Sequence, residues 1–152
     1  MTTRSSKAPE TASVGAADSQ RPAPTAGLRH VALYVRDFAA VERFYVELLG
    51  MSVEWRPDPD NVYLTSGGDN LALHRAPADF APAKSQRLDH IGFIIKAPEQ
   101  VDEWYEFLRR HEVSIKAPPR THRDGARSFY CADPDGNVVQ LIYHPPIVAG
   151  SL

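Results

Sequence analysis

Two stretches of the chain, RHVALYV at residues 29–35 and LDHIGFII at residues 88–95, decide the fold. Each alternates large apolar residues with polar or small ones, which is the pattern of a strand with one buried face. His30 and His90 occupy the same position in the two stretches, and the similarity continues downstream at the same spacing. The chain therefore contains an internal duplication.

An amphipathic helix is predicted after each of these strands. Apolar residues recur at i, i+3, i+4 and i+7 in both copies: Val41, Phe44, Tyr45 and Leu48 in the first, and Val101, Trp104, Tyr105 and Leu108 in the second. Asp37 is the expected N-cap of the first helix and Gly50 its stop, and Pro98 falls near the first turn of the second.

Three more strands follow each helix, separated by turn residues such as Asp133-Pro134-Asp135-Gly136. The predicted strands are 29–35, 51–56, 61–66 and 70–76 in the first copy, and 88–95, 113–117, 127–132 and 137–143 in the second. This order predicts an α+β fold made of two βαβββ modules, residues 28–77 and 87–146. Together they would form a curved mixed sheet around a central cleft.

The rest of the chain and its composition limit the function classes. Residues 1–27 have too few apolar side chains to fold and are expected to be a disordered tail, and 147–152 a short C-terminal tail. A formal net charge of −2 gives no reason to expect nucleic acid or an anionic membrane as partner. The apolar runs are too short for a membrane-spanning helix. The single cysteine, Cys131, favours a reducing cytoplasm and is expected in the core.

Polar side chains gather on the strand faces that the helices do not cover. Alternation along the strands predicts that the cleft is lined by His30, His74, His90, Gln140, Tyr63 and Tyr130, with Tyr34 on the same face. A histidine at the start of a strand is commonly a hydrogen-bonding rim residue. Two in register in a duplication make metal ligation an equal alternative, because neutral imidazole is a common metal ligand.

Other polar residues are open to both a functional and a structural interpretation. Tyr34, Tyr63 and Tyr130 either orient a substrate or fill the pocket. An insertion in the second copy contains residues 121–127, which either form a solvated loop or cover the cleft, with His122 or Arg127 holding an anionic group. Glu54 would share the open face if Val53 and Trp55 pack inward, and would be a distant alternative base.

The sequence resembles the vicinal oxygen chelate superfamily, which includes glyoxalase I, methylmalonyl-CoA epimerase, extradiol dioxygenases, and fosfomycin and bleomycin resistance proteins. The resemblance covers about residues 28–146. It is carried by RHVALYVRD at 29–37, FYVELLGM at 44–51, DHIGF at 89–93 and DPDGNVVQL at 133–141. It implies a divalent metal in the cleft that chelates two adjacent oxygens of a small substrate, and it implies a homodimer.

Carried over position by position, the family's metal ligands fall on His30, His90 and Gln140, while the fourth falls on Ala72. Both positions where the family usually has a carboxylate therefore lack one. His74, two residues beyond Ala72 on the same face, is the remaining nearby imidazole and is expected to act as a third imidazole or as the base. The resemblance leaves the metal open among Zn, Ni, Mn, Co and Fe(II), or none at all.

The leading functional hypothesis is a metal-dependent lyase or isomerase similar to glyoxalase or epimerase. Gln140 cannot take a proton as an inner-sphere glutamate would, which counts against a glyoxalase-type base at that position. The first alternative is a bleomycin-resistance-like protein that binds a small molecule without catalysis. The second is an extradiol-type dioxygenase, which normally needs two histidines and one carboxylate to hold Fe(II).

Overall fold

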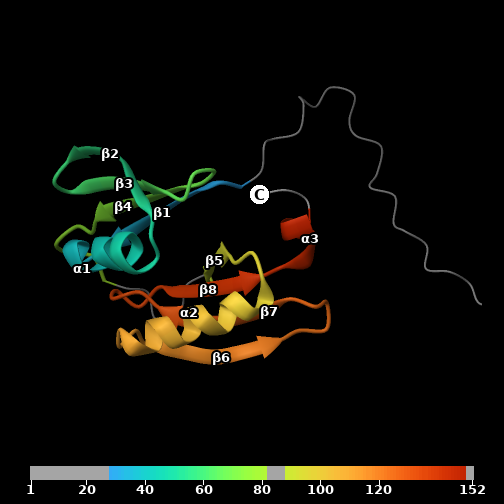
Figure 1. Ribbon diagram of the computed structural model, residues 1–152. Helices are drawn as coiled ribbons and strands as arrows, with labels where there is room; N and C mark the ends of the chain where they lie inside the picture. The colour runs from blue at the N-terminus through green and yellow to red at the C-terminus, as the bar shows by residue number, and fades with distance from the viewer. Residues whose placement is uncertain (1–27, 82–87, 150–152) are drawn as a thin grey trace, which may run out of the picture.

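The computed structural model describes residues 28–81 and 88–149. The expected N-terminal tail, residues 1–27, lies outside this part of the chain. The described residues form two four-stranded sheets, with strand orders β1-β4-β3-β2 and β5-β8-β7-β6. In Figure 1 the first sheet occupies the upper half of the molecule and the second the lower half. The duplication predicted from the sequence is therefore confirmed, because both modules have the same strand order.

In module one the strands are β1 (His30–Val35), β2 (Ser52–Asp58), β3 (Asn61–Thr65) and β4 (Asn70–Arg75). In module two they are β5 (Ile91–Ile94), β6 (Ile115–Thr121), β7 (Arg127–Ala132) and β8 (Val138–Tyr143). The first and last strands of each module pair in parallel, and the other neighbours pair antiparallel. A short helix, α3 (Pro145–Ala149), follows β8.

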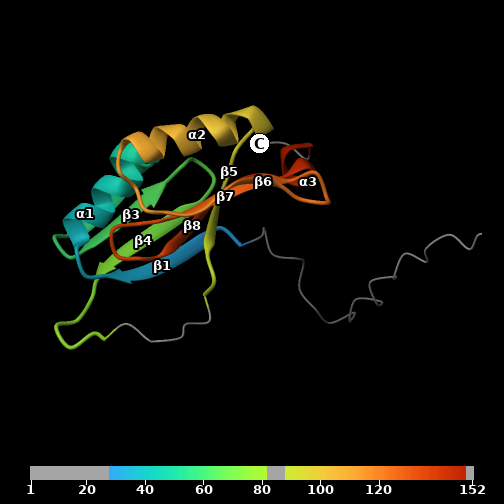
Figure 2. The ribbon, with the colours of Figure 1, turned by 90° about the horizontal axis from the view of Figure 1, so that it is seen from below.

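Both modules place their helix on the same side of the strands, as Figure 2 shows. Helix α1 (Phe38–Arg43) begins at Asp37, whose side chain accepts a hydrogen bond from the backbone N–H of Ala40. Helix α2 (Pro98–Arg110) has a proline in its first turn, as predicted. The apolar faces of these helices and strands merge into one core that includes residues of both modules. No helix in the described part of the chain is both long and apolar enough to cross a bilayer.

The first helix departs from the expected regular helix in its second half. Residues Phe44–Leu48 form a π-helical segment, η1, in which the N–H of Leu49 donates to the carbonyl of Phe44. Such wide turns are rare and occur mostly as single turns within α-helices. Tyr45 lies in this turn, is fully buried, and donates its hydroxyl proton to Asp133 of module two. The helix therefore also joins the modules.

The turn at residues 133–137 provides further contacts between the modules. Asp133 accepts hydrogen bonds from the backbone N–H groups of Asp135 and Asn137, which holds the tight turn. Asp135 accepts one from the backbone N–H of Arg36, at the end of β1. Asp133 therefore holds the turn and contacts module one through Tyr45. Asp135 contacts module one through Arg36.

Three strands differ from the sequence expectation. β5 spans only Ile91–Ile94 of the predicted 88–95, so His90 lies just before the strand. β6 (Ile115–Thr121) continues through two prolines, beyond the end of the predicted strand 113–117 and into the insertion that was expected to be irregular. It can do so because it is an edge strand and its pairing with β7 shifts register between Ala117 and Arg120. β2 has a similar irregularity between Val53 and Trp55. The inward packing considered for Trp55 is wrong, since its side chain is 58% exposed and its ring stacks on Tyr63.

Candidate metal and substrate site

His30, the first residue of β1, and His90, just before β5, each have one ring nitrogen hydrogen-bonded to an oxygen. His30 Nδ1 lies 2.6 Å from Oδ1 of Asn70, its partner across β1 and β4. His90 Nδ1 lies 2.6 Å from a carboxylate oxygen of Asp89. In metalloproteins, ligating histidines almost always donate their second ring N–H to such an acceptor, which leaves the other nitrogen for the metal.

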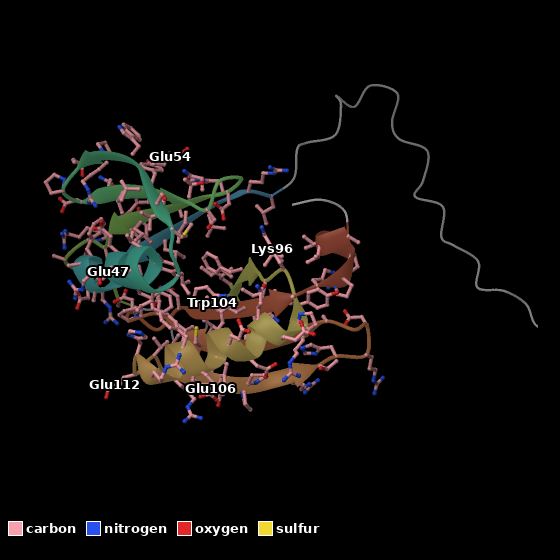
Figure 3. The ribbon with its side chains drawn as sticks, in the orientation of Figure 1. Glu47, Glu54, Lys96, Trp104, Glu106 and Glu112 are labelled. Atoms are coloured by element: carbon pink, nitrogen blue, oxygen red, sulfur yellow. The ribbon has the colours of Figure 1, made fainter. Side chains whose placement is uncertain are left out.

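The side chain of Glu54 fixes the hydrogen-bonding roles at His30. It accepts a hydrogen bond from Nδ2 of Asn70, so the oxygen of that amide is the end that faces the imidazole. A carboxylate can only accept, and an amide oxygen can only accept. His30 must therefore donate from Nδ1, and its Nε2 carries the free lone pair when the ring is neutral. Figure 3 labels Glu54 on β2, the strand at the far edge of this sheet from β1.

A second relay of the same composition lies further along the same sheet. Asn61 donates its Nδ2 protons to Asp58 and presents Oδ1 to Nδ1 of His74. His74 therefore also has its lone pair on Nε2. Because Asn70 pairs with His30 and His74 is four residues further along β4, the two histidines are separated by about 13 Å of strand. The structure does not bring His74 and His30 together.

Aromatic rings surround His74 on the uncovered face of the β1–β4 sheet. Tyr63 meets it edge-on at 6.0 Å between ring centres, and Tyr34 lies at 6.2 Å. Trp55 stacks on Tyr63 at 5.1 Å, and Phe80 lies 5.9 Å from Tyr34. Tyr34 and Trp55 are both more than half exposed. The face is thus an open aromatic surface with one oriented imidazole at its centre.

Module two gathers a different set of polar groups around Gln140. Nε2 of Gln140 donates to the hydroxyls of Tyr130, at 2.8 Å, and Ser128, at 3.0 Å. Ser128 is also 2.9 Å from Nε2 of His122. His90 meets the ring of Tyr130 edge-on at 5.3 Å. His90, Tyr130 and Gln140 therefore lie together, as the alternation of residues along the strands predicted.

Arg127 is engaged within the protein. Its guanidinium binds both carboxylate oxygens of Asp102 on α2, at 2.6 and 2.8 Å, and donates to Thr121. The hydrogen bond from Arg127 holds the pKa of the Asp102 carboxyl below its usual value. This ion pair joins β7 to α2, so the structure supplies a structural role for Arg127 in place of the anion contact considered from the sequence.

A crevice of about 280 Å³ lies between the modules. It is lined by residues of both, including Asn70, the partner of His30, and His90 and Gly92 of the second module. Among residues 28–81 and 88–149, no three His, Cys, Asp or Glu side chains are grouped as a metal site. A site here would depend on histidines from both modules together with an amide.

Sequence reasoning missed the groups that orient these side chains. Asn70 and Asn61 carry no recognisable motif, and their roles depend on the pairing of β4 with β1 and β3. Ser128 was not singled out, although it is almost fully buried and its hydroxyl lies between Gln140 and His122. The one available signal was the alternation that put Ser128, Tyr130 and Gln140 on one face.

Comparison with known proteins agrees with this architecture. Residues 27–141 match the model of the glyoxalase/bleomycin resistance protein/dioxygenase superfamily. Metallothiol transferase FosB of Staphylococcus epidermidis is 30% identical over 117 residues, covering 75% of this chain and 79% of that protein. Virulence protein STM3117 of Salmonella typhimurium is 29% identical over 120 residues, covering 74% and 80%.

Solved structures show the same fold. Lactoylglutathione lyase from Agrobacterium tumefaciens superposes with a TM-score of 0.65 at 23% identity, covering 80% of this chain and 96% of that one. The structure of STM3117 gives a TM-score of 0.61 at 26% identity, covering 80% and 99%. The chain belongs to the glyoxalase/bleomycin resistance protein/dioxygenase superfamily, the vicinal oxygen chelate superfamily that its duplicated strands resemble.

Proposed function

We propose that this protein is a divalent-metal-dependent enzyme acting on a small substrate with two adjacent oxygens. The proposed ligands are Nε2 of His30, Nε2 of His90 and Oε1 of Gln140. The observation that carries the proposal is the anchoring of both imidazoles through Nδ1, by Asn70 and Asp89, which leaves both Nε2 lone pairs available. The donor set fits a borderline cation such as Zn²⁺, Ni²⁺ or Co²⁺ better than Ca²⁺ or Mg²⁺.

A bound divalent cation would supply Lewis acidity to the substrate oxygens. The protein's own groups would then bind and orient the substrate. Tyr130 accepts a hydrogen bond from Gln140, so its own hydroxyl proton remains to be donated to a substrate oxygen. Tyr34 and Tyr63 offer aromatic surface on the sheet that carries His30. His74 would accept a proton or a hydrogen bond at Nε2 from a part of the substrate remote from the metal.

The proposal includes a homodimer and a cytoplasmic location. The open aromatic face of the β1–β4 sheet supports the dimer, because Tyr34 and Trp55 are 57% and 58% exposed in the single chain. A second copy covering this face would enclose the substrate. Mixing His30→Ala and His90→Ala proteins after reversible dissociation tests whether ligands come from two chains, since mixed dimers would then regain metal at half of their sites.

Metal analysis of the freshly purified protein tests the proposed function. We expect close to one divalent ion per chain, lost from His30→Ala and from His90→Ala. His111→Ala is the matched control, because this exposed histidine lies at the end of α2 and packs on Phe107. Metal-free wild-type protein that is correctly folded would contradict the proposal and favour the non-catalytic binding protein. Bound iron with catechol-dependent oxygen uptake would favour the dioxygenase.

A further inference from the structure

The side-chain amide of Gln140 must be turned in one particular way to bind a cation, whereas a carboxylate at this position would bind in either orientation. Either oxygen of a glutamate can bind a cation, whichever way the group is turned. A glutamine has one acceptor end and one donor end, and only the oxygen can bind. If Gln140 is a metal ligand, as the proposed function holds, the protein must control which end of the amide faces the metal.

The structure holds the donor end of the amide toward the neighbouring strand β7. Both hydrogen bonds of Nε2 are made to hydroxyls of β7, Tyr130 and Ser128, and Gln140 itself is only 7% exposed. Oε1 lies on the side of β5, where a methyl group added to Gly92 would be 3.7 Å from it. His90 lies just before β5, two residues before Gly92. The acceptor end of the amide thus faces the strand that directly follows the proposed metal ligand His90.

The donors and acceptors available at Ser128 explain what holds the Gln140 amide in this orientation. Ser128 has one proton and two lone pairs, and it is buried to 1% exposure, so bulk water does not compete for them. While its oxygen accepts from Gln140, its proton is free to be donated to Nε2 of His122, 2.9 Å away. Without that acceptor, the serine proton would compete for Oε1 and favour the reversed amide.

We propose that Ser128, supported by His122, is a positioning residue that holds the Gln140 amide with its oxygen toward the metal. This role replaces the anion contact considered for His122 from the sequence. It also accounts for how a member of this family uses a glutamine as ligand. The inference rests on the proposed metal site and adds residues that do not themselves touch the metal.

A double-mutant cycle with the full-length protein tests the inference. Co²⁺ is titrated into the apoprotein, and its d–d absorption reports both affinity and coordination. We expect Ser128→Ala to weaken Co²⁺ binding about tenfold, within the range for groups that orient metal ligands. In a Gln140→Glu background the same change should cost less than about twofold, because a carboxylate has no wrong orientation. A packing role for Ser128 would give similar losses in both backgrounds.

Two further variants keep the test decisive. His122→Ala, at a half-buried position in the β6–β7 turn, should weaken binding in the same direction, and its effect should also disappear in the Gln140→Glu background. Ser114→Ala removes an exposed hydroxyl at the start of β6 and should change nothing. Equal Co²⁺ affinity of wild type, Ser128→Ala and His122→Ala would overturn the inference while leaving the metal site standing. Failure of the wild-type protein to bind Co²⁺ would instead overturn the proposed function.

Discussion

Two asparagines, Asn70 and Asn61, fix which ring nitrogen donates a hydrogen bond in the histidines of module one. Each donates to a carboxylate, Glu54 or Asp58, and thereby turns its oxygen toward an imidazole. The carboxylates thus lie near the proposed metal site and are not among its proposed ligands. The asparagine oxygen is a weaker acceptor than a carboxylate, so the imidazole is oriented without direct pairing to a charge.

Substitution of Asn70 tests this relay. Asn70→Ala should weaken metal binding by about tenfold or more, because His30 loses the acceptor that fixes its tautomer and ring orientation. Isothermal titration calorimetry with Co²⁺ provides the measurement. Asn61→Ala is the matched control, since it removes the same group from the relay to His74. An equal loss of affinity in the two variants would mean that the asparagines act through general stability.

At the scale of elements, the contacts between the π-helical turn and the turn after β7 hold the modules together. The hydroxyl of Tyr45 donates to Asp133 at 3.0 Å, and both residues are almost fully buried. Burial, with the nearby Asp133 carboxylate as a second cause, raises the pKa of Tyr45 well above its usual value. The phenol is therefore neutral at any ordinary pH and remains a donor.

Tyr45→Phe should lower the free energy of unfolding by about 1–3 kcal/mol, because the buried carboxylate of Asp133 loses one of its donors. Urea unfolding followed by circular dichroism measures this loss. Tyr105→Phe, which removes a hydroxyl from a half-buried ring packed on Phe129, is expected to stay within about 0.5 kcal/mol of wild type. Equal stability of Tyr45→Phe and wild type would show that Asp133 is satisfied by its own turn.

The ion pair between α2 and β7 predicts a pH dependence. Because Arg127 lowers the pKa of Asp102 from 3.8, the pair stabilises the fold above that pH and the contribution is lost as the pH falls through the lower folded value. Asp102→Asn should cost about 0.5 kcal/mol at pH 7, a small amount since Asp102 is half exposed. The difference should shrink as the pH falls below 3.8 and the Asp102 carboxyl becomes protonated in both states. A constant difference down to pH 2 in acid unfolding curves would contradict this.

Across the whole molecule, the sequence was enough to predict the repeat, the order of the strands and the faces of most of their side chains. Periodicity depends on local geometry, and His90, Tyr130 and Gln140 meet because alternation and strand order suffice to place them. The separation of His74 from His30, the bulge that exposes Trp55, and the partners of Arg127 could not be predicted. These depend on register between strands and on side chains distant in the sequence.

X-ray absorption spectroscopy of the metal-loaded protein tests the proposed metal site most directly, because it counts imidazole ligands. With Co²⁺ or Zn²⁺ bound, we predict two imidazoles and otherwise oxygen ligands around the metal. One imidazole should remain in His30→Ala and one in His90→Ala, measured at metal concentrations high enough to load these weaker sites. A third imidazole, sulfur scattering, or an imidazole count unchanged in both variants would contradict a site built from His30, His90 and Gln140.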